Sequence, residues 1–200
     1  MRVDLLLAEN WVRPGSRVLD LGCGDGQLLS HLASRCGVRG YGVEIDPGQI
    51  CACVQRGVNV IEHNLDDGLQ RFATDSFDTV FLTMALQVLA RPHVVLDDML
   101  RIGREAIVTF PNFAYWQARF YLTLTGKMPM SSALPYHWYD TPNIHLCTFC
   151  DFDALCAERG IKILDRQAVN HAQVGGPMMR LLPNLFGEIA IYRVQRRVSL

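Results

Sequence analysis

The sequence predicts an α/β fold with a mainly parallel, seven-stranded sheet, helices on both faces and an antiparallel C-terminal strand. Apolar runs with strand character alternate with helical patterns, which is typical of parallel strands joined by helical crossovers. A glycine-rich stretch from Asp20 to Gly26 joins the first apolar run to a helical pattern, and glycine permits the tight turn needed there. Glu44 ends the next apolar run. This order of strand, glycine turn, helix and carboxylate predicts a nucleotide-type cradle.

The elements follow one another with short connections. Strands are expected over residues 17–21, 40–44, 59–61, 77–82 and 105–110, which are rich in apolar and β-branched residues. Helices are expected over residues 26–34, 47–55 and 92–100, and Pro92 suits a first helical turn. Residues 161–164 and 189–194 are expected to form a terminal antiparallel pair around a loop containing Gly175, Gly176 and Pro177. Residues 1–10 carry acids within an apolar pattern, so we expect an amphipathic helix and not a signal peptide.

Composition narrows the class of protein. The 200 residues suit one domain over residues 1–200, large enough to bury a core without disulfides. The formal net charge of -1 gives no electrostatic footprint for nucleic acid or an anionic membrane. No apolar run approaches the roughly 20 residues that cross a bilayer. We therefore expect a cytoplasmic protein.

The cysteines point to a reduced protein without a metal site. There are seven, an odd number scattered through apolar segments, which favours free thiols over a disulfide framework. Cys147 and Cys150 form a C-x-x-C pair, but no second pair stands at zinc-finger spacing. We expect these two cysteines in the core or at a helix start, with a metal or redox role as the alternative.

The spacing within the glycine loop separates the possible cofactors. The loop reads D-x-G-x-G-x-G, whereas a dinucleotide fingerprint needs a third glycine where Gln27 stands. A phosphate-binding P-loop needs a lysine at the helix start, and none is present. The spacing resembles motif I of class I S-adenosylmethionine (SAM)-dependent methyltransferases, which implies their Rossmann-like fold. In that family the acid in the place of Glu44 holds both ribose hydroxyls, and a carboxylate can accept from two hydroxyls at once.

The same resemblance implies further cofactor contacts, with SAM or S-adenosylhomocysteine as the ligand. Asp20 would reach the amino end of the ligand, and Ile45 and Leu65 would pack on the two faces of adenine. Asn64 stands where many relatives carry an acid, and its amide can pair with an adenine edge. The loop would approach the amino-acid moiety and the sugar through Gly22, Cys23, Gly24 and Gly26. The alternative is an ordinary α/β turn without a ligand.

The end of the fourth expected strand is the place for a methyl acceptor. Thr83 and Gln87 follow it and could line an acceptor pocket. The Asp/Asn-Pro-Pro-Tyr motif of N-methyltransferases is absent there, which argues against a nucleobase or glutamine amine as acceptor. Asp78, at the start of the same strand, is expected to anchor the strand and not to take part in chemistry.

Residues 111–146 interrupt the regular alternation and predict an aromatic cap over the carboxyl ends of the strands, or a docking surface for a partner. His137 and His145 are the candidate general bases, with a hydrogen-bonded structural role as the alternative. Trp138 and Tyr139, like Trp116, could be core under the cap or interface anchors. Arg119 could pair with Asp140 or hold a ligand carboxylate.

The second half of the chain narrows the resemblance. The stretch from Thr109 to Phe113, then Gly126 to Pro129, and above all the segment Trp138-Tyr139-Asp140-Thr141-Pro142-Asn143-Ile144-His145 resemble the MetW family of methionine-biosynthesis proteins, which occurs in proteobacteria and some other bacteria. The resemblance covers nearly the whole chain. It implies a role beside homoserine O-acyltransferase (MetX-type), the enzyme of the first committed step toward methionine.

Three functions follow from the resemblance. The first is a SAM-binding accessory or regulatory partner of the acyltransferase. The second is an active SAM-dependent methyltransferase that acts on a small molecule. The third is a scaffold that does not bind SAM, which the chemically competent Asp20, Glu44 and glycine loop argue against.

Overall fold

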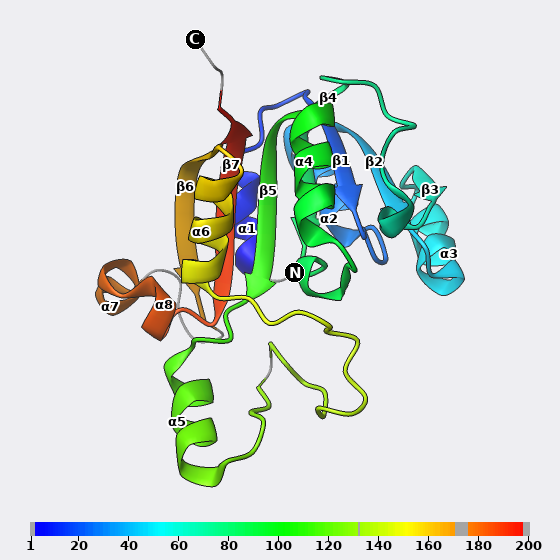
Figure 1. Cartoon of the computed structure of the whole chain (residues 1–200). Helices are drawn as coiled ribbons and strands as arrows, with labels where there is room; N and C mark the ends of the chain where they lie inside the picture. The colour runs from blue at the N-terminus through cyan, green and yellow to red at the C-terminus, as the bar shows by residue number, and fades with distance from the viewer. Residues whose placement is uncertain (1–2, 132, 171–175, 198–200) are drawn as a thin grey trace.

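The computed structural model describes residues 3–131, 133–170 and 176–197. Figure 1 shows one twisted sheet, with α4 and α6 packed in front of it and α1 and α2 behind it. Among the described residues, no helix combines the length and the apolar character that crossing a membrane requires.

The seven strands lie in the order β3-β2-β1-β4-β5-β7-β6. β1 to β5 pair with one another in parallel, and β7 runs antiparallel to both β5 and β6. The strands are β1 (Arg17–Leu21), β2 (Arg39–Glu44), β3 (Val60–Glu62), β4 (Phe77–Thr83), β5 (Gly103–Pro111), β6 (Ile161–Val169) and β7 (Ile189–Arg196). The predicted sheet and its antiparallel C-terminal strand are confirmed.

The chain leaves β1 toward β2 on one side, whereas β4 pairs on the other side. Such a reversal of strand order opens a crevice at the carboxyl ends of the strands, and open α/β sheets bind ligands there. The glycine loop follows β1 directly, so the topology places it at this crevice.

The helices extend the prediction and correct it in the C-terminal half. They are α1 (Val3–Glu9), α2 (Gln27–Cys36), α3 (Pro47–Gln55), α4 (Pro92–Ile102), α5 (Trp116–Thr125), α6 (Phe149–Glu158), α7 (Pro177–Leu181) and α8 (Pro183–Phe186), with short 3₁₀ turns η1 (Leu65–Asp67) and η2 (Leu86–Val88). A loop was expected between β6 and β7, but the described part of this segment forms the helices α7 and α8. Gly175 lies outside the described residues. α5 and α6 were not predicted from the sequence.

Two apolar clusters cover the two faces of the sheet. Successive strand residues point to opposite faces, so Val80 packs in one cluster and Phe81 in the other. The first cluster contains a group of aromatic rings in which Phe110 stacks on Tyr192 at a centroid distance of 5.8 Å. Tyr192 donates its hydroxyl proton to Asp153 at 2.8 Å, which gives this buried polar group a partner. These aromatic contacts pack β5 and β7 against α6.

Residues 111–146, termed the insert below, begin where β5 ends and project from the carboxyl ends of the strands (Figure 1). Asn112 fixes the base of the insert, because its amide group donates to the carbonyls of Asn184 at 3.0 Å and Gly187 at 2.7 Å. α5 buries none of its residues. The insert is therefore an anchored protrusion and adds little to the core.

The structure excludes one of the two alternatives for Arg119 and one of the two for Trp138 and Tyr139. Arg119 donates to the carbonyl of Ala114 and does not pair with Asp140, since it lies on α5 next to the base of the insert. Trp138 and Tyr139 are 74% and 68% exposed, so they are not core residues beneath a cap.

Candidate functional site: a cofactor pocket at the carboxyl ends of the strands

The glycine loop adopts a backbone that glycine makes possible. Gly22, Gly24 and Gly26 have φ values of 69°, 54° and 74°, in the left-handed region that residues with a Cβ rarely adopt. The amides of Gly22 and Cys23 donate to the carbonyl of Val43 at 2.8 and 3.1 Å, and that of Gly26 donates to Cys23 at 3.1 Å. These amides hold the loop against β2 from within the protein.

Glu44 is the best-organised acidic group of the site. Its Oε2 atom accepts from the amide of Gly24 at 2.8 Å, and its Oε1 atom accepts from the amides of Ile45 at 2.8 Å and Asp46 at 3.1 Å. A carboxylate offers about four acceptor positions. Three of these positions are occupied by amides, so one on Oε2 remains for a ligand hydroxyl. A second hydroxyl would have to compete with the longer hydrogen bond from the Asp46 amide.

A cavity of about 320 Å³ lies beside this carboxylate. Its wall comes from the ends of β1, β2 and β4 and from the segments that follow β3 and β4. The residues that line it are Gly22, Val43, Glu44, Ile45, His63, Asn64, Leu65, Asp66, Thr83, Met84, Ala85, Val88 and Leu89. The cavity thus brings together Gly22, Glu44, Ile45, Asn64, Leu65 and Thr83 of the residues expected to bind the cofactor.

The remaining expected residues lie behind this wall. Asp20 is 1% exposed at the end of β1. The Cys23 side chain faces the core, 3.8 Å from the sulfur of Cys53, and burial raises the pKa of both thiols. A Cβ on Gly26 would lie 3.0 Å from the Cys53 sulfur, so this glycine permits close packing of the loop on α3. Cys23 and Gly26 are therefore supports of the loop.

The segment after β3 supplies one side of the cavity. Asn64 caps the η1 turn, because its Oδ1 atom accepts from the amide of Asp66 at 3.1 Å. This leaves the NH2 group of Asn64 as its part that can reach an adenine. Leu65 is 9% exposed and Ile45 is 57% exposed, so a base that fits between them finds a fixed apolar face and an open one.

Sequence reasoning did not foresee which residues after β4 face the cavity. Met84 has a positive φ of 56° and lines the cavity together with Val88. Gln87 is 7% exposed and does not line the cavity; its amide group donates to the carbonyl of Met84 at 2.8 Å. The position of this segment after a strand was the one available signal.

The two candidate bases lie in the insert, apart from the cavity beside Glu44. His137 stacks on Tyr139 with a centroid distance of 5.2 Å, and it lines a separate cavity of about 80 Å³. The ring of His145 is exposed and lies 3.5 Å from the carbonyl of Ala90. Neither histidine lines the cavity beside Glu44.

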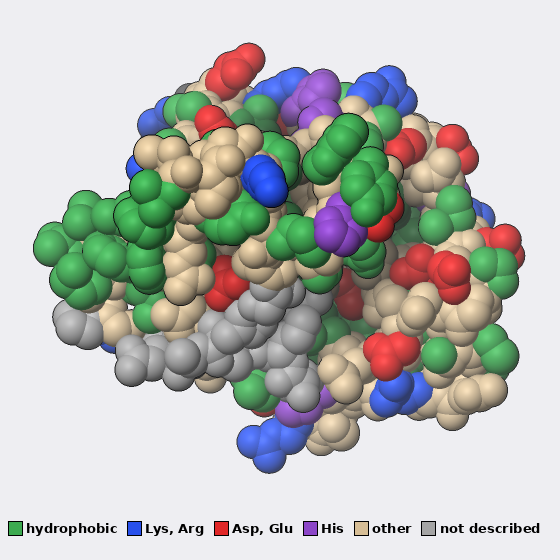
Figure 2. Space-filling model, turned by 90° about the horizontal axis from the view of Figure 1, so that it is seen from below, with side chains coloured by type: hydrophobic (Ala, Val, Ile, Leu, Met, Phe, Trp, Pro, Cys, Tyr) green, Lys and Arg blue, Asp and Glu red, His purple; other side chains and the backbone are tan. Residues whose placement is uncertain are grey.

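The insert carries an exposed apolar surface. Figure 2, which views the molecule from this end, shows several hydrophobic side chains grouped on the surface. Trp138 packs edge-to-face on Tyr139 at 5.6 Å. The exposed large apolar residues of the insert are Trp116, Phe120, Tyr121, Leu122, Leu124, Met128, Met130, Tyr136, Trp138, Tyr139, Ile144 and Leu146. Large exposed apolar surfaces are typical of interaction sites.

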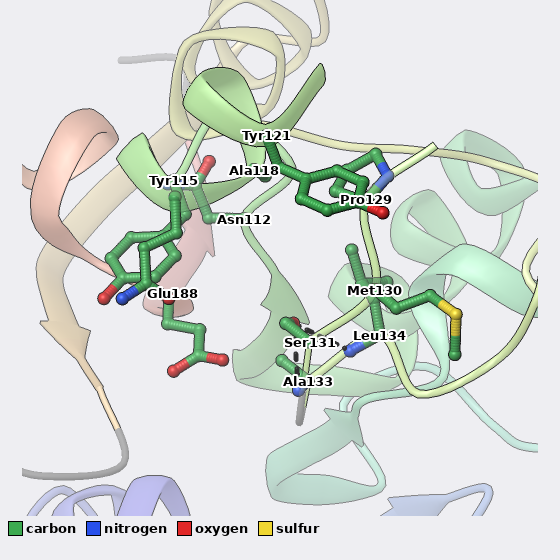
Figure 3. Close-up of a pocket in the computed structure, with 11 residues that line it drawn as sticks. Asn112, Tyr115, Ala118, Tyr121, Pro129, Met130, Ser131, Ala133, Leu134 and Glu188 are labelled. Carbon is green, nitrogen blue, oxygen red and sulfur yellow. Dashed lines mark hydrogen bonds between the residues drawn. The ribbon is translucent and has the colours of Figure 1, made fainter. Parts of the chain in front are cut away.

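A further cavity of about 170 Å³ lies at the base of the insert, and no expected cofactor residue lines it. Tyr121 and Pro129 lie on one side of it, and Tyr115 and Glu188 lie on the other (Figure 3). Within the described residues, no group of three or more His, Cys, Asp or Glu side chains is placed to hold a metal ion.

Comparisons with known proteins agree with this geometry. The family model described as "Methionine biosynthesis protein MetW" matches residues 2–194. The bifunctional methionine biosynthesis protein MetXA/MetW of Rhodopirellula baltica is 38% identical over 158 residues, which are 74% of this chain and 25% of that protein. The chain thus spans about a quarter of the length of this relative.

Solved structures show the same fold at low identity. A putative methyltransferase in complex with the Trm112 activator of Haloferax volcanii superposes with a TM-score of 0.71 at 16% identity, covering 98% of this chain and 90% of the other. A SAM-dependent methyltransferase of Thermotoga maritima gives a TM-score of 0.67 at 16% identity, covering 98% and 88%. The fold is therefore that of class I SAM-dependent methyltransferases. Together with the family match over nearly the whole sequence, this shows that the chain belongs to the MetW family of methionine biosynthesis proteins.

Proposed function

We propose that this protein binds SAM or S-adenosylhomocysteine in the cavity beside Glu44 and acts in methionine biosynthesis as an accessory partner of homoserine O-acyltransferase. The observation that carries the first half is the Glu44 carboxylate, which three backbone amides hold at the rim of the cavity. A group fixed in this way binds a ribose hydroxyl without further ordering, which favours affinity.

The residues of the cavity fit the parts of such a ligand. The ribose lies at Glu44, and adenine lies between Ile45 and Leu65 with the Asn64 NH2 group at its edge. The methionine part extends along the glycine loop toward Thr83 at the end of β4. When bound, SAM would supply an activated methyl group there, and the protein's part is to hold and orient the ligand.

Calorimetric titration of the purified protein with SAM tests the first half of the proposal. Glu44→Gln removes the negative charge, so we expect at least about tenfold weaker binding, since hydrogen bonds to a charged group contribute about 1.5–3 kcal/mol. Glu62→Gln is the matched control, because Glu62 pairs with Glu44 across β2 and β3 but is absent from the cavity wall. Binding that is absent in the wild type, or equal in both variants, contradicts the proposal.

The second half of the proposal concerns the aromatic surface of the insert. The acyltransferase is its occupant because the Rhodopirellula baltica relative is named as a MetXA and a MetW protein in one chain, so the two proteins are joined there. In this chain Trp138 and Tyr139 are the most exposed aromatic residues. Such rings provide large contact area with little loss of side-chain freedom, as binding hot spots do.

Copurification with the acyltransferase of the same organism tests this surface. The double variant Trp138→Ala and Tyr139→Ala is expected to lose the complex, whereas Tyr41→Ala keeps it. Tyr41 is also an exposed aromatic residue, but it lies on β2, outside the insert. If the double variant retains the complex, the insert is not the docking surface. Transfer of label from methyl-labelled SAM to a compound in a metabolite extract would instead identify an active methyltransferase.

A further inference from the structure

Met84 has an unusual backbone conformation. Among the described residues other than glycine, only Asp75 and Met84 have a positive φ, at 54° and 56°. Aspartate tolerates this region, because its short polar side chain bonds locally, whereas methionine has no such compensation. A residue held in this conformation needs neighbours that fix it, and such residues concentrate at functional sites.

Two residues fix Met84 from opposite sides. Its amide donates to the carbonyl and hydroxyl oxygens of Thr109 on β5, at 2.9 and 3.1 Å. Its carbonyl accepts from the Gln87 side chain at 2.8 Å. Gln87 is 7% exposed, so solvent does not compete for this bond. The Met84 backbone, which belongs to the cavity wall, is thus bonded to Thr109 on one side and to Gln87 on the other.

The backbone of Gln87 meets the insert. Its carbonyl accepts from the amides of Ile144 at 2.9 Å and His145 at 3.1 Å, close to where the insert ends before α6. The ring of His145 also lies against the carbonyl of Ala90, so the returning chain rests on the segment after β4. One residue is thus bonded to the insert by its backbone and to the cavity wall by its side chain.

We infer that Gln87 is a positioning residue that holds Met84 in its left-handed conformation and couples the position of the insert to the cofactor cavity. This rests on the proposed function for the identity of the ligand and the partner. A partner that shifts the insert shifts the carbonyl bonds of Gln87 and then Met84. By linkage, SAM and the partner change each other's affinity by the same factor.

The variant Gln87→Met tests the positioning role. Methionine keeps the length of the side chain and removes the donor to Met84. The Oε1 atom of Gln87 is buried with no hydrogen-bond partner in the described part of the chain, so the apolar replacement removes an unsatisfied acceptor and the fold is retained. We expect SAM binding to weaken about two- to tenfold, the equivalent of one neutral hydrogen bond. Thr79→Val is the matched control. It removes the partly buried hydrogen bond that Thr79 on β4 donates to Glu105 on β5, and neither residue lines the cavity, so we expect SAM affinity to be unchanged.

A double-mutant cycle separates positioning from general loosening. Glycine adopts a positive φ without cost, so in a Met84→Gly background the change Gln87→Met is expected to weaken SAM binding by less than in the wild type. An equal loss in both backgrounds, or no loss in the first, overturns the inference. Addition of the acyltransferase is expected to change the SAM affinity of the wild type more than that of Gln87→Met, and an equal change also overturns it.

Hydrogen exchange tests the same bond without any ligand. In Gln87→Met the amides of Met84 and Val88 are expected to exchange faster than in the wild type, while those of β1 are unchanged. If wild-type protein fails to bind SAM, the proposed function is wrong, and the exchange result still decides on Gln87. Unchanged exchange at Met84 and Val88 overturns the positioning role.

Discussion

The substitution Gly42→Ala, which adds one carbon atom to β2, tests how this strand supports the glycine loop. Gly42 lies in the middle of β2, opposite Asp20 on one side and Val60 on the other. A Cβ built on Gly42 would overlap the sulfur of Cys23, and it would lie 3.0 Å from the Cβ of Cys23 and 3.4 Å from a methyl group of Leu29. The strand cannot move away, because neighbouring strands pair with it on both sides.

Gly42→Ala is therefore an overpacking substitution. Such changes cost about 1–3 kcal/mol of unfolding free energy, which for a chain of this size lowers Tm by about 2–12 °C. The relief must come from Cys23, and its displacement disturbs the adjoining Gly24 amide that donates to Glu44. We therefore expect weaker SAM binding together with the lower stability.

Urea unfolding followed by circular dichroism measures the first effect, and Cys23→Ala provides the control. Alanine removes the sulfur that the new Cβ would meet, so Gly42→Ala should cost about 1 kcal/mol less in the Cys23→Ala background. The urea m-value should stay the same in all four proteins. Equal costs of Gly42→Ala in the two backgrounds would refute the packing argument.

Four more predictions concern parts of the molecule outside the pocket. Thr148→Ala removes the capping box that Thr148 and Asp151 form at the start of α6, so stability should fall by about 1 kcal/mol in urea unfolding, while Thr148→Ser keeps most of it. The Arg193 guanidinium donates to the Glu105 carboxylate at 2.7 and 3.0 Å, and the Glu105 side chain is only 12% exposed. Arg193→Met should therefore lower the free energy of unfolding by about 2 kcal/mol, whereas Lys162→Met on the exposed surface should not change it. Iodoacetamide near neutral pH should label the exposed Cys51 and Cys150 first, which mass spectrometry of the digested protein would show. Burial raises the pKa of Cys147 and Cys156 to about 12, so these thiols stay protonated in the folded protein, whereas they ionise near pH 9 in the unfolded chain. The free energy of unfolding is therefore unaffected below about pH 9 and should fall as the pH rises from about 9 toward 12. A Tm that stays flat over this range would contradict the burial argument.

Local signals account for the elements that the sequence predicts best. The bounds of β1 and α3 match the expectation at both ends. Pro47 stands at the first helical position of α3, and Asp46 caps that helix by accepting from the amide of Gln49 at 2.8 Å. α6 also carries such a signal, since Thr148 and Asp151 have capping-box spacing, and the sequence reasoning passed over it.

The elements and contacts that sequence reasoning missed depend on distant partners. α5 exposes its apolar residues and lacks a side-chain cap, so neither periodicity nor capping marks it. The position of Glu44 at the carboxyl end of β2 follows from the sequence pattern, whereas its cofactor role stays a prediction. The conformation of Met84 was not predictable, because it depends on Thr109 from β5 and on Gln87, which the returning insert contacts.

The amides that hold Glu44 have a consequence for selectivity. They fix the carboxylate before any ligand arrives, so every adenosine that enters the cavity meets the same anchor. SAM and S-adenosylhomocysteine share their adenosine and differ by one methyl group and one positive charge at sulfur. In the proposed binding mode, a ribose anchor at Glu44 would not distinguish the methyl donor from its demethylated product. Discrimination between the two would fall to the end of β4, where Thr83 and Met84 line the cavity, and there the cell's ratio of donor to product would be read.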